Sequence, residues 1–417
     1  MPSVSLGFKV HIPYHLKKFI SGDVGSYSNW FDEQACKVAV DRLCDESYVP
    51  VNNIIHALIK NYKGAFKIAF SFSGTAVELL QKHRPDVLRS FVQLVETGCV
   101  EIYAETYYHS LSWLYSKNEF KRQVQKHGDL VRLIFGEEPR IFRNTELIYS
   151  NELAIFIAGL GYKGILCEGL ERILNGRTAN QTYAAPRNGD FGLLLRNVRL
   201  SDDIAFRFDD LTWNEQPLTA DKYGNWLHNL NTGTDNVNLF LDYETFGIHK
   251  KKTSGIFEFL ELLPAAILND ARWRFVTPSE AIDLYYPKGI YDVPETISWE
   301  DKEMERYISS NNMMQNNTLR KIYSLESMVT TSALPGAMEW WGSLQTADHF
   351  YYMCNDGRTE NDTYRLPNPF NSSEEAFENY KNAVAEFEIR LIQRVLDDIK
   401  NTRAPNTISK IFSTMIY

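Results

Sequence analysis

Leu239-Phe-Leu-Asp-Tyr-Glu-Thr-Phe-Gly-Ile-His249 is the stretch of sequence around which the rest of the chain is organised. It opens with apolar residues that suit a buried strand, and Asp242 and Glu244 follow where that strand should end. Gly247 then breaks the strand. A buried charge without a partner is strongly disfavoured, so acids at the end of a buried strand must reach solvent or face a polar cleft. Taken alone, the stretch fits either a solvated strand end or the rim of an active site.

The same arrangement recurs along the first two thirds of the chain, where short apolar runs lead into polar clusters and then into helical patterns. The strand-like runs are residues 4–10, 66–72, 99–103, 140–143, 164–167, 193–195, 237–241 and 274–276. Strands that alternate with helices predict a parallel α/β fold. Seven or eight such units favour a barrel, with the polar clusters at the C-terminal strand ends where barrel chemistry takes place. An open doubly wound sheet ranks second, because no glycine-rich phosphate loop follows a strand.

The composition changes after about residue 294, where helical patterns replace the strand-like runs. The clearest helix is predicted over residues 373–400, with apolar residues three or four apart. Ser373 is the expected N-cap, and Glu374 and Glu375 suit the first turn. A polar loop over 355–371 interrupts the region. We therefore predict a barrel domain over residues 1–294 and a helical domain over 295–417.

The composition excludes several classes of protein. A chain of 417 residues with a net charge of −9 lacks the basic surface that nucleic-acid binding needs. Five cysteines without a CxxC pair indicate reduced thiols rather than disulfides or a zinc site. Neither a signal peptide nor a membrane-spanning run is recognisable, so the expected location is the cytoplasm. Aromatic residues make up 13% of the chain, which suits a sugar-lined cleft and equally an aromatic core.

Two carboxylates at predicted strand ends, Glu146 and Asp242, dominate the candidate chemistry. If they face each other across one cleft, they form the pair that glycoside hydrolysis requires. His11, His109 and His249 at other strand ends suggest a metal site as an alternative, but they lack HxH or HExxH spacing. We expect them to be hydrogen-bonding partners, and we predict no metal and no cofactor.

Five blocks of sequence, spread over essentially the whole chain, resemble the family 57 glycoside hydrolases, the retaining α-amylase-like family. The blocks are Val10-His-Ile-Pro-Tyr14, Glu101-Ile-Tyr-Ala-Glu-Thr-Tyr-Tyr-His-Ser-Leu111, Phe142-Arg-Asn-Thr-Glu-Leu-Ile-Tyr149, Leu239-Phe-Leu-Asp-Tyr-Glu-Thr-Phe-Gly247 and Trp341-Gly-Ser-Leu-Gln-Thr-Ala-Asp-His-Phe-Tyr-Tyr352. The resemblance places the nucleophile on Glu146 and the general acid/base on Asp242. It implies an incomplete TIM-like (β/α)7 barrel, with a C-terminal α-helical bundle that completes the substrate cleft. It also implies retaining chemistry on α-1,4-glucans or malto-oligosaccharides without a metal.

The resemblance further implies a set of residues that line the sugar subsites. These are His11, Glu105, His109, Glu244 and Asp348, with Trp113 and Trp341 as stacking faces. Glu105 and Asp348 have a structural hydrogen-bonding role as their alternative, and each tryptophan a place in the core. Two departures from the family pattern are Ile12, where glutamine is usual, and residues 247–251, which lack an acid and an aromatic residue. Loss of the amide at position 12 is expected to weaken a sugar subsite or to shift specificity.

Three activities fit these residues. The first is an α-amylase-type glycosidase, and the second is a 4-α-glucanotransferase that uses the same residues with a sugar acceptor. The third is a glucan-binding protein with little turnover, since a fold does not guarantee a function. A metal-dependent polysaccharide deacetylase would need an early Asp-Asp pair and HxxxH spacing, which we do not find. The sequence does not predict an oligomeric state.

Overall fold

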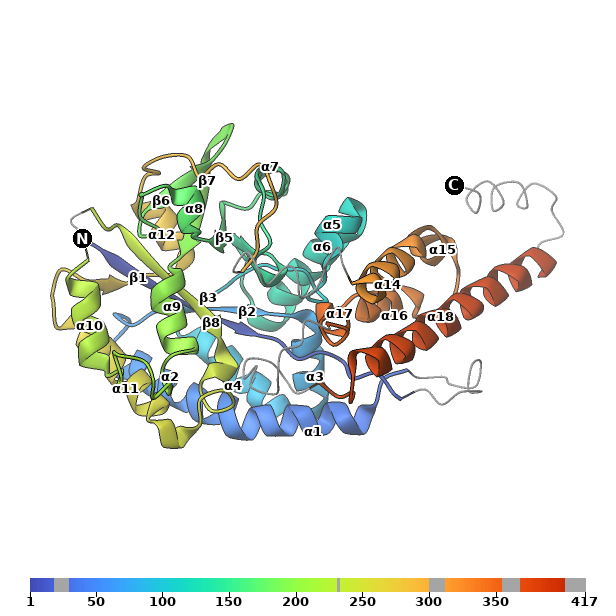
Figure 1. Cartoon of the computed structure of the whole chain (residues 1–417), viewed down its shortest axis with the longest axis horizontal. Helices are drawn as coiled ribbons and strands as arrows, with labels where there is room; N and C mark the ends of the chain where they lie inside the picture. Colours follow the sequence, from blue (N-terminus) through green and yellow to red (C-terminus); the bar gives the residue numbers. More distant parts are fainter. Residues whose placement is uncertain (19–29, 231–232, 300–311, 355–367, 402–417) are drawn as a thin grey trace.

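The computed structural model of the protein describes residues 1–18, 30–230, 233–299, 312–354 and 368–401. Its centre is a nearly closed barrel of parallel strands in the order β3-β2-β1-β8-β7-β5-β4 (Figure 1). The strands are β1 (Ser3–Val10), β2 (Ile68–Phe72), β3 (Val100–Ile102), β4 (Ile141–Arg143), β5 (Gly164–Glu168), β7 (Asn188–Arg196) and β8 (Asn236–Asp242). Beyond the end of β3, the Ala104 carbonyl accepts a hydrogen bond from the amide of Arg143, the last residue of β4, at 2.8 Å, which narrows the remaining gap.

The alternation of side chains along β1 explains its central place in the barrel. Val4 and Phe8 point outward and are fully buried in the apolar layer under the surrounding helices. Gly7 points inward, where a Cβ atom would lie 2.9 Å from the Phe240 ring, so glycine leaves room for the barrel interior. Lys9 and His11 lie on the same inward face as Gly7, because they follow it by two and four residues; His11 comes directly after the last residue of β1. The strand therefore delivers two polar side chains to the C-terminal mouth of the barrel.

Helices cover the outside of the barrel. They are α1 (Glu33–Leu43), α2 (Val49–Asn61), α3 (Gly74–His83), α4 (Pro85–Glu96), α5 (Ser112–Tyr115), α6 (Lys117–Phe135), α7 (Asn151–Gly159), α8 (Glu171–Leu174), α9 (Val198–Ala205), α10 (Ala220–His228), α11 (Ile256–Leu268) and α12 (Pro278–Leu284). Their apolar faces pack on the outward strand residues, as where Phe91 of α4 meets Phe70 and Phe72 of β2 edge to face. A π-helical turn, Cys44–Tyr48, joins α1 to α2.

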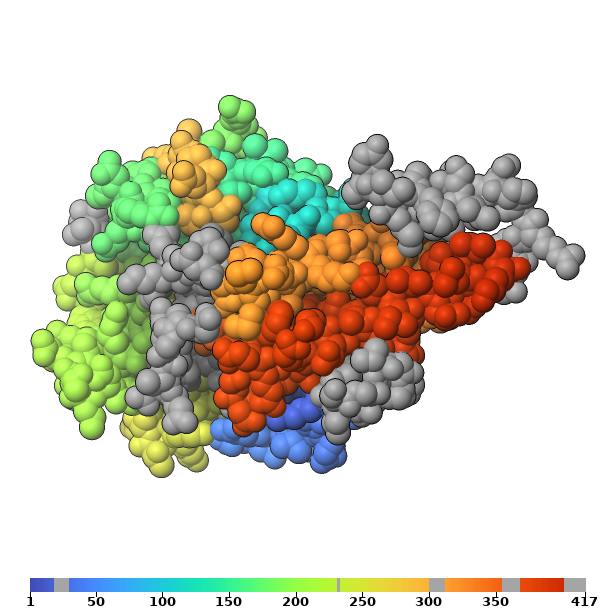
Figure 2. All heavy atoms as spheres, turned by 45° about the vertical axis from the view of Figure 1, so that its right-hand side comes forward, coloured from blue at the N-terminus to red at the C-terminus, as the bar shows by residue number. Residues whose placement is uncertain are grey.

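The C-terminal helices gather on one side of the barrel. They are α14 (Met313–Ser324), α15 (Glu326–Thr331), α16 (Ala337–Leu344), α17 (Ala347–Tyr351) and α18 (Ser373–Asn401). Figure 2 shows α18, in red, beside the orange helices of this group. The Ala347 amide donates to the His109 carbonyl at 3.0 Å. This bond fixes the start of α17 against the loop that follows β3, at the mouth of the barrel.

The fold class predicted from the sequence is confirmed, with three local differences. The sequence analysis missed β6 (Thr182–Ala185), a short strand antiparallel to β7. The predicted strand at 274–276 is β9 (Arg274–Phe275), which pairs with the start of β1 outside the barrel path. The helix at 373–400 is present as α18, but Ser372 rather than Ser373 caps it, because the Ser372 hydroxyl accepts from the Glu375 amide.

Most of the predicted loop, residues 355–367, lies outside the described residues. The domain boundary at residue 294 stays a prediction. In the described part of the chain, no helix is both long and apolar enough to cross a membrane.

Candidate active site

Glu146 lies in a short turn directly after β4, with its backbone in the left-handed region at φ 51°. A residue other than glycine seldom adopts this conformation, and such strain collects at functional sites. Two contacts hold the turn. The Thr145 and Thr106 hydroxyls are hydrogen-bonded at 2.8 Å, and the Trp299 amide donates to the Glu146 carbonyl at 2.8 Å. The carboxyl group is therefore presented by a backbone that its surroundings fix in place.

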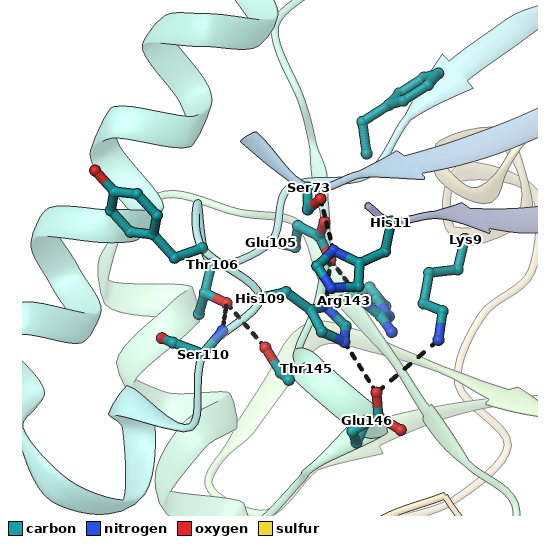
Figure 3. Close-up of polar contacts among 12 residues, drawn as sticks. Lys9, His11, Ser73, Glu105, Thr106, His109, Ser110, Arg143, Thr145 and Glu146 are labelled. Carbon is teal, nitrogen blue, oxygen red and sulfur yellow. Dashed lines mark hydrogen bonds and ion pairs between the residues drawn. The ribbon is translucent and has the colours of Figure 1, made fainter. Parts of the chain in front are cut away.

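His109 holds the Glu146 carboxyl group from the loop after β3 (Figure 3). Its Nε2 lies 2.9 Å from Glu146 Oε1, and its Nδ1 lies 3.7 Å from Glu105 Oε2. Glu105 is fully buried in an ion pair with Arg143. Burial, the largest single effect, would raise the pKa of Glu105, but the charge of Arg143 and the hydrogen bond and charge of His109 together outweigh it and lower the pKa to about 2. A fixed ionised acid thus stands behind the histidine that contacts Glu146.

His11 and Asp348 join the barrel to the C-terminal helices. The His11 ring stacks on His109 with centroids 4.1 Å apart. Its Nδ1 lies 2.7 Å from the Ser73 hydroxyl, and its Nε2 lies 2.8 Å from Asp348 Oδ2. Burial opposes ionisation of Asp348, yet His11 and His109 lower its pKa to about 2. Burial, and next His109, lower the pKa of His11. Asp348 belongs to α17, so this helix supplies a charge to the mouth of the barrel.

Asp242 and Glu244 lie at the end of β8 and in the turn that follows it. The Asp242 side chain is 18% exposed, whereas Glu244 is buried and accepts a hydrogen bond from the Tyr48 hydroxyl. Burial and the neighbouring charge of Asp242 raise the pKa of Glu244 to about 8. Glu244 therefore carries a proton at neutral pH. Position 247, directly after this turn, requires glycine, because a Cβ atom there would lie 2.0 Å from the Glu46 carbonyl oxygen.

Lys9 joins the two acids that come from opposite sides of the site. Its Nζ lies 2.9 Å from Asp242 Oδ1 and 3.9 Å from Glu146 Oε1. These distances, 2.9 and 3.9 Å, mean that the two carboxyl oxygens are at most about 7 Å apart. The two carboxyl groups lie about 5–5.5 Å apart in retaining glycosidases and roughly 6.5–9.5 Å apart in inverting ones. Asp242 and Glu146 therefore face one gap, although 95 residues stand between them in the sequence.

The structure brings most of the predicted site residues together. Those at the mouth of the barrel are Glu146, Asp242, His11, Glu105, His109, Glu244 and Asp348. The two tryptophans lie elsewhere. Trp341 is fully buried and donates to the Ile322 carbonyl, and Trp113 is buried against Phe120. A ring needs an exposed face to stack on a sugar, so we correct the expectation that either one is a stacking platform.

The departure at Ile12 also has a different meaning from the one expected. Ile12 is fully buried in the apolar layer outside the barrel, on the strand face opposite His11. Its side chain contributes to packing, so the lost amide is not a lost sugar contact. No three His, Cys, Asp or Glu side chains in the described ranges lie close enough together to hold a metal ion.

Sequence reasoning missed two residues of the site. Lys9 could have been found, because it stands two residues before His11 and therefore shares its strand face. Trp299 had no such signal, since it follows the predicted end of the barrel domain. Its ring lies 5.7 Å from Lys9 Nζ and 4.5 Å from the buried Arg196 guanidinium group. Trp299 thus forms an apolar wall beside the gap between the acids.

Comparisons with known proteins show which family this sequence resembles. The sequence profile described as glycosyl hydrolase family 57 matches residues 5–294. A Methanocaldococcus jannaschii protein named "Putative alpha-amylase" is 36% identical over 397 residues, which cover 92% of this chain and 84% of that protein.

Two solved structures have the same fold at low sequence identity. The 4-alpha-glucanotransferase from Thermococcus litoralis superposes with a TM-score of 0.65 at 16% identity over 91% of this chain, which spans 59% of that structure. A GH57 branching enzyme from Thermococcus kodakaraensis superposes with a TM-score of 0.64 at 13% identity, covering 93% of this chain and 89% of that one.

Proposed function

The chain belongs to glycosyl hydrolase family 57, and from this premise we propose that it is a retaining α-amylase-type glycosidase. Its substrates are α-1,4-linked glucans or malto-oligosaccharides. Glu146 is the nucleophile, and Asp242 is the general acid/base. The observation that carries this proposal is the shared contact of both carboxyl groups with Lys9, which keeps their oxygens within about 7 Å of each other.

Glu146 suits the part of nucleophile because its environment favours a fixed carboxylate. A proton on His109 Nε2 makes the ring a donor to Glu146 Oε1 at 2.9 Å. The side chain is only 4% exposed, so little water competes for the carboxylate. In the first step Glu146 attacks the anomeric carbon, and the glycosidic bond breaks as a glycosyl-enzyme ester forms.

Asp242 suits the role of general acid/base because its side chain is more exposed to solvent than that of Glu146. At 18% exposure it can reach a leaving sugar oxygen and later a water molecule. It gives its proton to the leaving oxygen in the first step. In the second step it takes a proton from the water that attacks the glycosyl-enzyme, which releases Glu146 and the sugar. Burial and the charge of Asp242 raise the pKa of Glu244 to about 8, which favours the neutral form of Glu244 beside an ionised Asp242.

The charges at the site favour a neutral glycan. Carboxyl side chains outnumber cationic ones there, so the site has no attraction for an anionic substrate. His11 and Asp348 present polar atoms that suit sugar hydroxyls. We also propose that residues 1–294 form the catalytic domain and that 295–417 form a helical domain that completes the cleft, through Asp348 of α17.

Incubation with maltoheptaose, with products resolved by chain length, tests the proposal. We expect the purified protein to release shorter sugars, and Glu146→Gln to lower kcat by at least about 10³-fold. Glu137→Gln, which makes the same chemical change at an exposed position, should leave the rate unchanged. Equal turnover by wild type and Glu146→Gln would refute the assignment of the nucleophile.

A 4-α-glucanotransferase is the second candidate, because the Glu146 side chain is enclosed. The same enclosure would keep water away from the glycosyl ester that forms on Glu146. The two reactions differ in whether water or a sugar accepts the glycosyl group. Products both longer and shorter than maltoheptaose would identify the transferase. Binding of maltoheptaose without turnover by the wild type would instead support the glucan-binding protein.

A further inference from the structure

A cavity of about 500 Å³ lies beside α1 and is lined by residues other than those that surround Glu146 and Asp242. It is formed by α1 with the loop that leads into it, by the loop after β8, and by the segment that precedes α18 (Figure 1). Its apolar lining comprises Ala35, Val38, Ala39, Leu43, Ile248 and Pro369. Small-molecule sites usually have volumes of about 300–1,000 Å³. The cavity is therefore large enough for a ligand group of its own.

The sequence of α1 explains why this cavity is present. Cys36 and Val40 are buried in the apolar layer between α1 and the barrel. Ala35, Val38 and Ala39 lie on the neighbouring face of the same helix. The two alanines are short, and Val38 is 57% exposed, so this face leaves a hollow beside the segment that precedes α18. An apolar ligand would remove these side chains from water, which is favourable.

The cavity lies on the side of the site from which the leaving group departs. Lys9 of β1 and Asp242 of β8 are Cα partners in adjacent parallel strands. Six residues farther along each segment stand His15 and Ile248, which both line the cavity. Glu146 reaches the gap from the turn after β4, at the other end of the strand order. Because Asp242 is the proposed general acid, the leaving oxygen faces β1, β8 and the loops that follow them.

His15 connects the polar part of the site with the cavity. Burial lowers the pKa of His15, whereas the charges of Asp348 and then Asp32 oppose this effect, so both acids are near the ring. Asp348 also pairs with His11 beside the catalytic gap. Asp32 caps α1 and lines the cavity. A substrate group that leaves the gap past Asp348 and His15 would therefore meet the apolar lining.

The lining favours an apolar group over another glucose unit. In the described part of the chain, no Phe, Tyr or Trp lines the cavity, so a sugar ring finds no flat aromatic face on which to stack. Aliphatic walls offer no hydrogen bonds to sugar hydroxyl groups, but they suit an alkyl or aryl group. The exposed polar residues Gln34, Arg42 and Asn368 form the rim. An apolar floor with a few polar groups is the usual composition of a ligand pocket.

We propose that this cavity binds an apolar group attached to the reducing end of the glucan, so that the enzyme accepts malto-oligosaccharides with an alkyl or aryl aglycone. A group at the reducing end stays on the leaving-group side of the bond that is cleaved. Hydrolysis needs no further reactant. The glycosidic bond breaks, Asp242 gives its proton to the leaving oxygen, and water supplies the hydroxyl group of the released sugar. The other product is the alcohol, or the shorter glycoside, that carries the apolar group.

The inference deepens the proposed function and rests on it for the catalytic step, but binding in the cavity can be measured without turnover. Methyl, butyl, hexyl and octyl α-maltoside, each below its micelle concentration, are titrated calorimetrically into Glu146→Gln. Burial of one methylene group corresponds to about a fourfold change in affinity. We expect the Kd to fall by about two- to fourfold for each added methylene until the cavity is full. A Kd that stays constant from methyl to octyl would refute the proposal.

Two variants in the Glu146→Gln background place polar groups in the cavity from different elements. Val38→Asp and Ile248→Ser should each lower the ratio of octyl to methyl affinity at least about tenfold and leave the Kd of methyl maltoside unchanged. Ile155→Asp is the matched control, because Ile155 is a 49% exposed β-branched residue of α7 that does not line the cavity. Thermal unfolding verifies that all three variants are folded. Chain-length dependence that persists in both cavity variants, or that Ile155→Asp also removes, would overturn the proposal.

A protein interface is the other occupant that these variants detect. If Val38→Asp changes the oligomeric state in analytical ultracentrifugation and leaves the chain-length dependence intact, the cavity is an interface between two copies of the chain. That result would also overturn the proposal.

Hydrolysis by the wild type separates a failure of this inference from a failure of the proposed function. We expect kcat/KM for the alkyl maltosides to rise with chain length, in parallel with their affinity. A kcat/KM that stays constant while affinity rises would place the cavity off the leaving-group side and refute the inference. Turnover of maltoheptaose with chain-length-independent binding of the maltosides would refute this inference alone. Chain-length-dependent binding without turnover of any maltoside or of maltoheptaose would refute only the proposed function.

Discussion

Arg143→Met removes the positive charge that stands behind the candidate nucleophile. Arg143 and Glu105 are both fully buried and ion-paired, and Glu105 faces the histidine that contacts Glu146. Methionine replaces the aliphatic stem of arginine without a charge and lacks the guanidinium carbon and its two terminal nitrogens. The substitution therefore leaves a buried carboxylate without its main partner.

The size of the effect follows from the ionisation of Glu105. Against the cost of burial, Arg143 and then His109 lower its pKa from 4.5 to about 2. At about 1.4 kcal/mol for each pKa unit, the ionised form is favoured by about 3.5 kcal/mol relative to a solvated glutamate. Removing one partner of a buried pair typically costs about 3–5 kcal/mol. We expect Arg143→Met to lower the free energy of unfolding by a similar amount, about 3–5 kcal/mol at pH 7.

The pH dependence has a definite sign. In wild type the folded-state pKa of Glu105 lies below its unfolded value, so its contribution to stability is present above about pH 4.5 and is lost as pH falls toward 2. In Arg143→Met burial dominates, and the pKa of Glu105 rises above 4.5. The variant should therefore approach the wild type in stability as pH falls from about 7 to about 4.

Urea denaturation of wild type, Arg143→Met, Glu105→Gln and the double variant measures these terms. The double variant should recover at least about half of the loss in Arg143→Met, because it contains no unpaired charge. A loss below about 1 kcal/mol in Arg143→Met would refute the reasoning. So would a loss that does not change between pH 7 and pH 4, or a double variant whose loss equals the sum of the two single losses.

Three further predictions concern other parts of the site. The pKa of Glu244 near 8 lies above its ordinary 4.5, so the stability of the wild type should fall as pH rises through this range. Glu244→Gln should remove up to about 5 kcal/mol of that fall, measured by urea denaturation between pH 5 and pH 9. Gly247→Ala, at φ 112° and with its new methyl group against the Glu46 carbonyl, should lower the free energy of unfolding by about 2–3 kcal/mol or more in the same assay. Asp348→Asn should lower the pKa of His11 further, seen by NMR of the imidazole ring, and cost about 1.5–3 kcal/mol of stability because a charge-assisted hydrogen bond is lost.

The barrel was predictable because its strands and helices carry a strong local signal. Outward residues such as Val4 and Phe8 are apolar, and polar residues follow the strands where the barrel opens. The strand β6 was missed because Thr-Tyr-Ala-Ala is short and lacks a clear alternation. It owes its conformation to pairing with β7, which is a tertiary contact.

The site was predictable in its residue types more than in its geometry. Glu146 and Asp242 were singled out as acids at predicted strand ends, and the family resemblance supplied their roles, but their sequence separation contains no information about their distance. Trp341 and Trp113 were misjudged because an aromatic residue in a motif can serve the core as well as the cleft. The role of Lys9 depends on which strand lies beside β1, and only the topology supplies that information.

Trapping of the glycosyl-enzyme tests most directly whether Glu146 is the nucleophile. α-Maltosyl fluoride has a leaving group that needs no acid, so Asp242→Asn should still form the ester but hydrolyse it slowly without its base. We predict a maltosyl adduct on the peptide that contains Glu146, detected by mass spectrometry, and no adduct when Glu146→Gln is added. Fluoride release without an adduct, or an adduct on a different carboxylate, would contradict the assignment of Glu146 as the nucleophile.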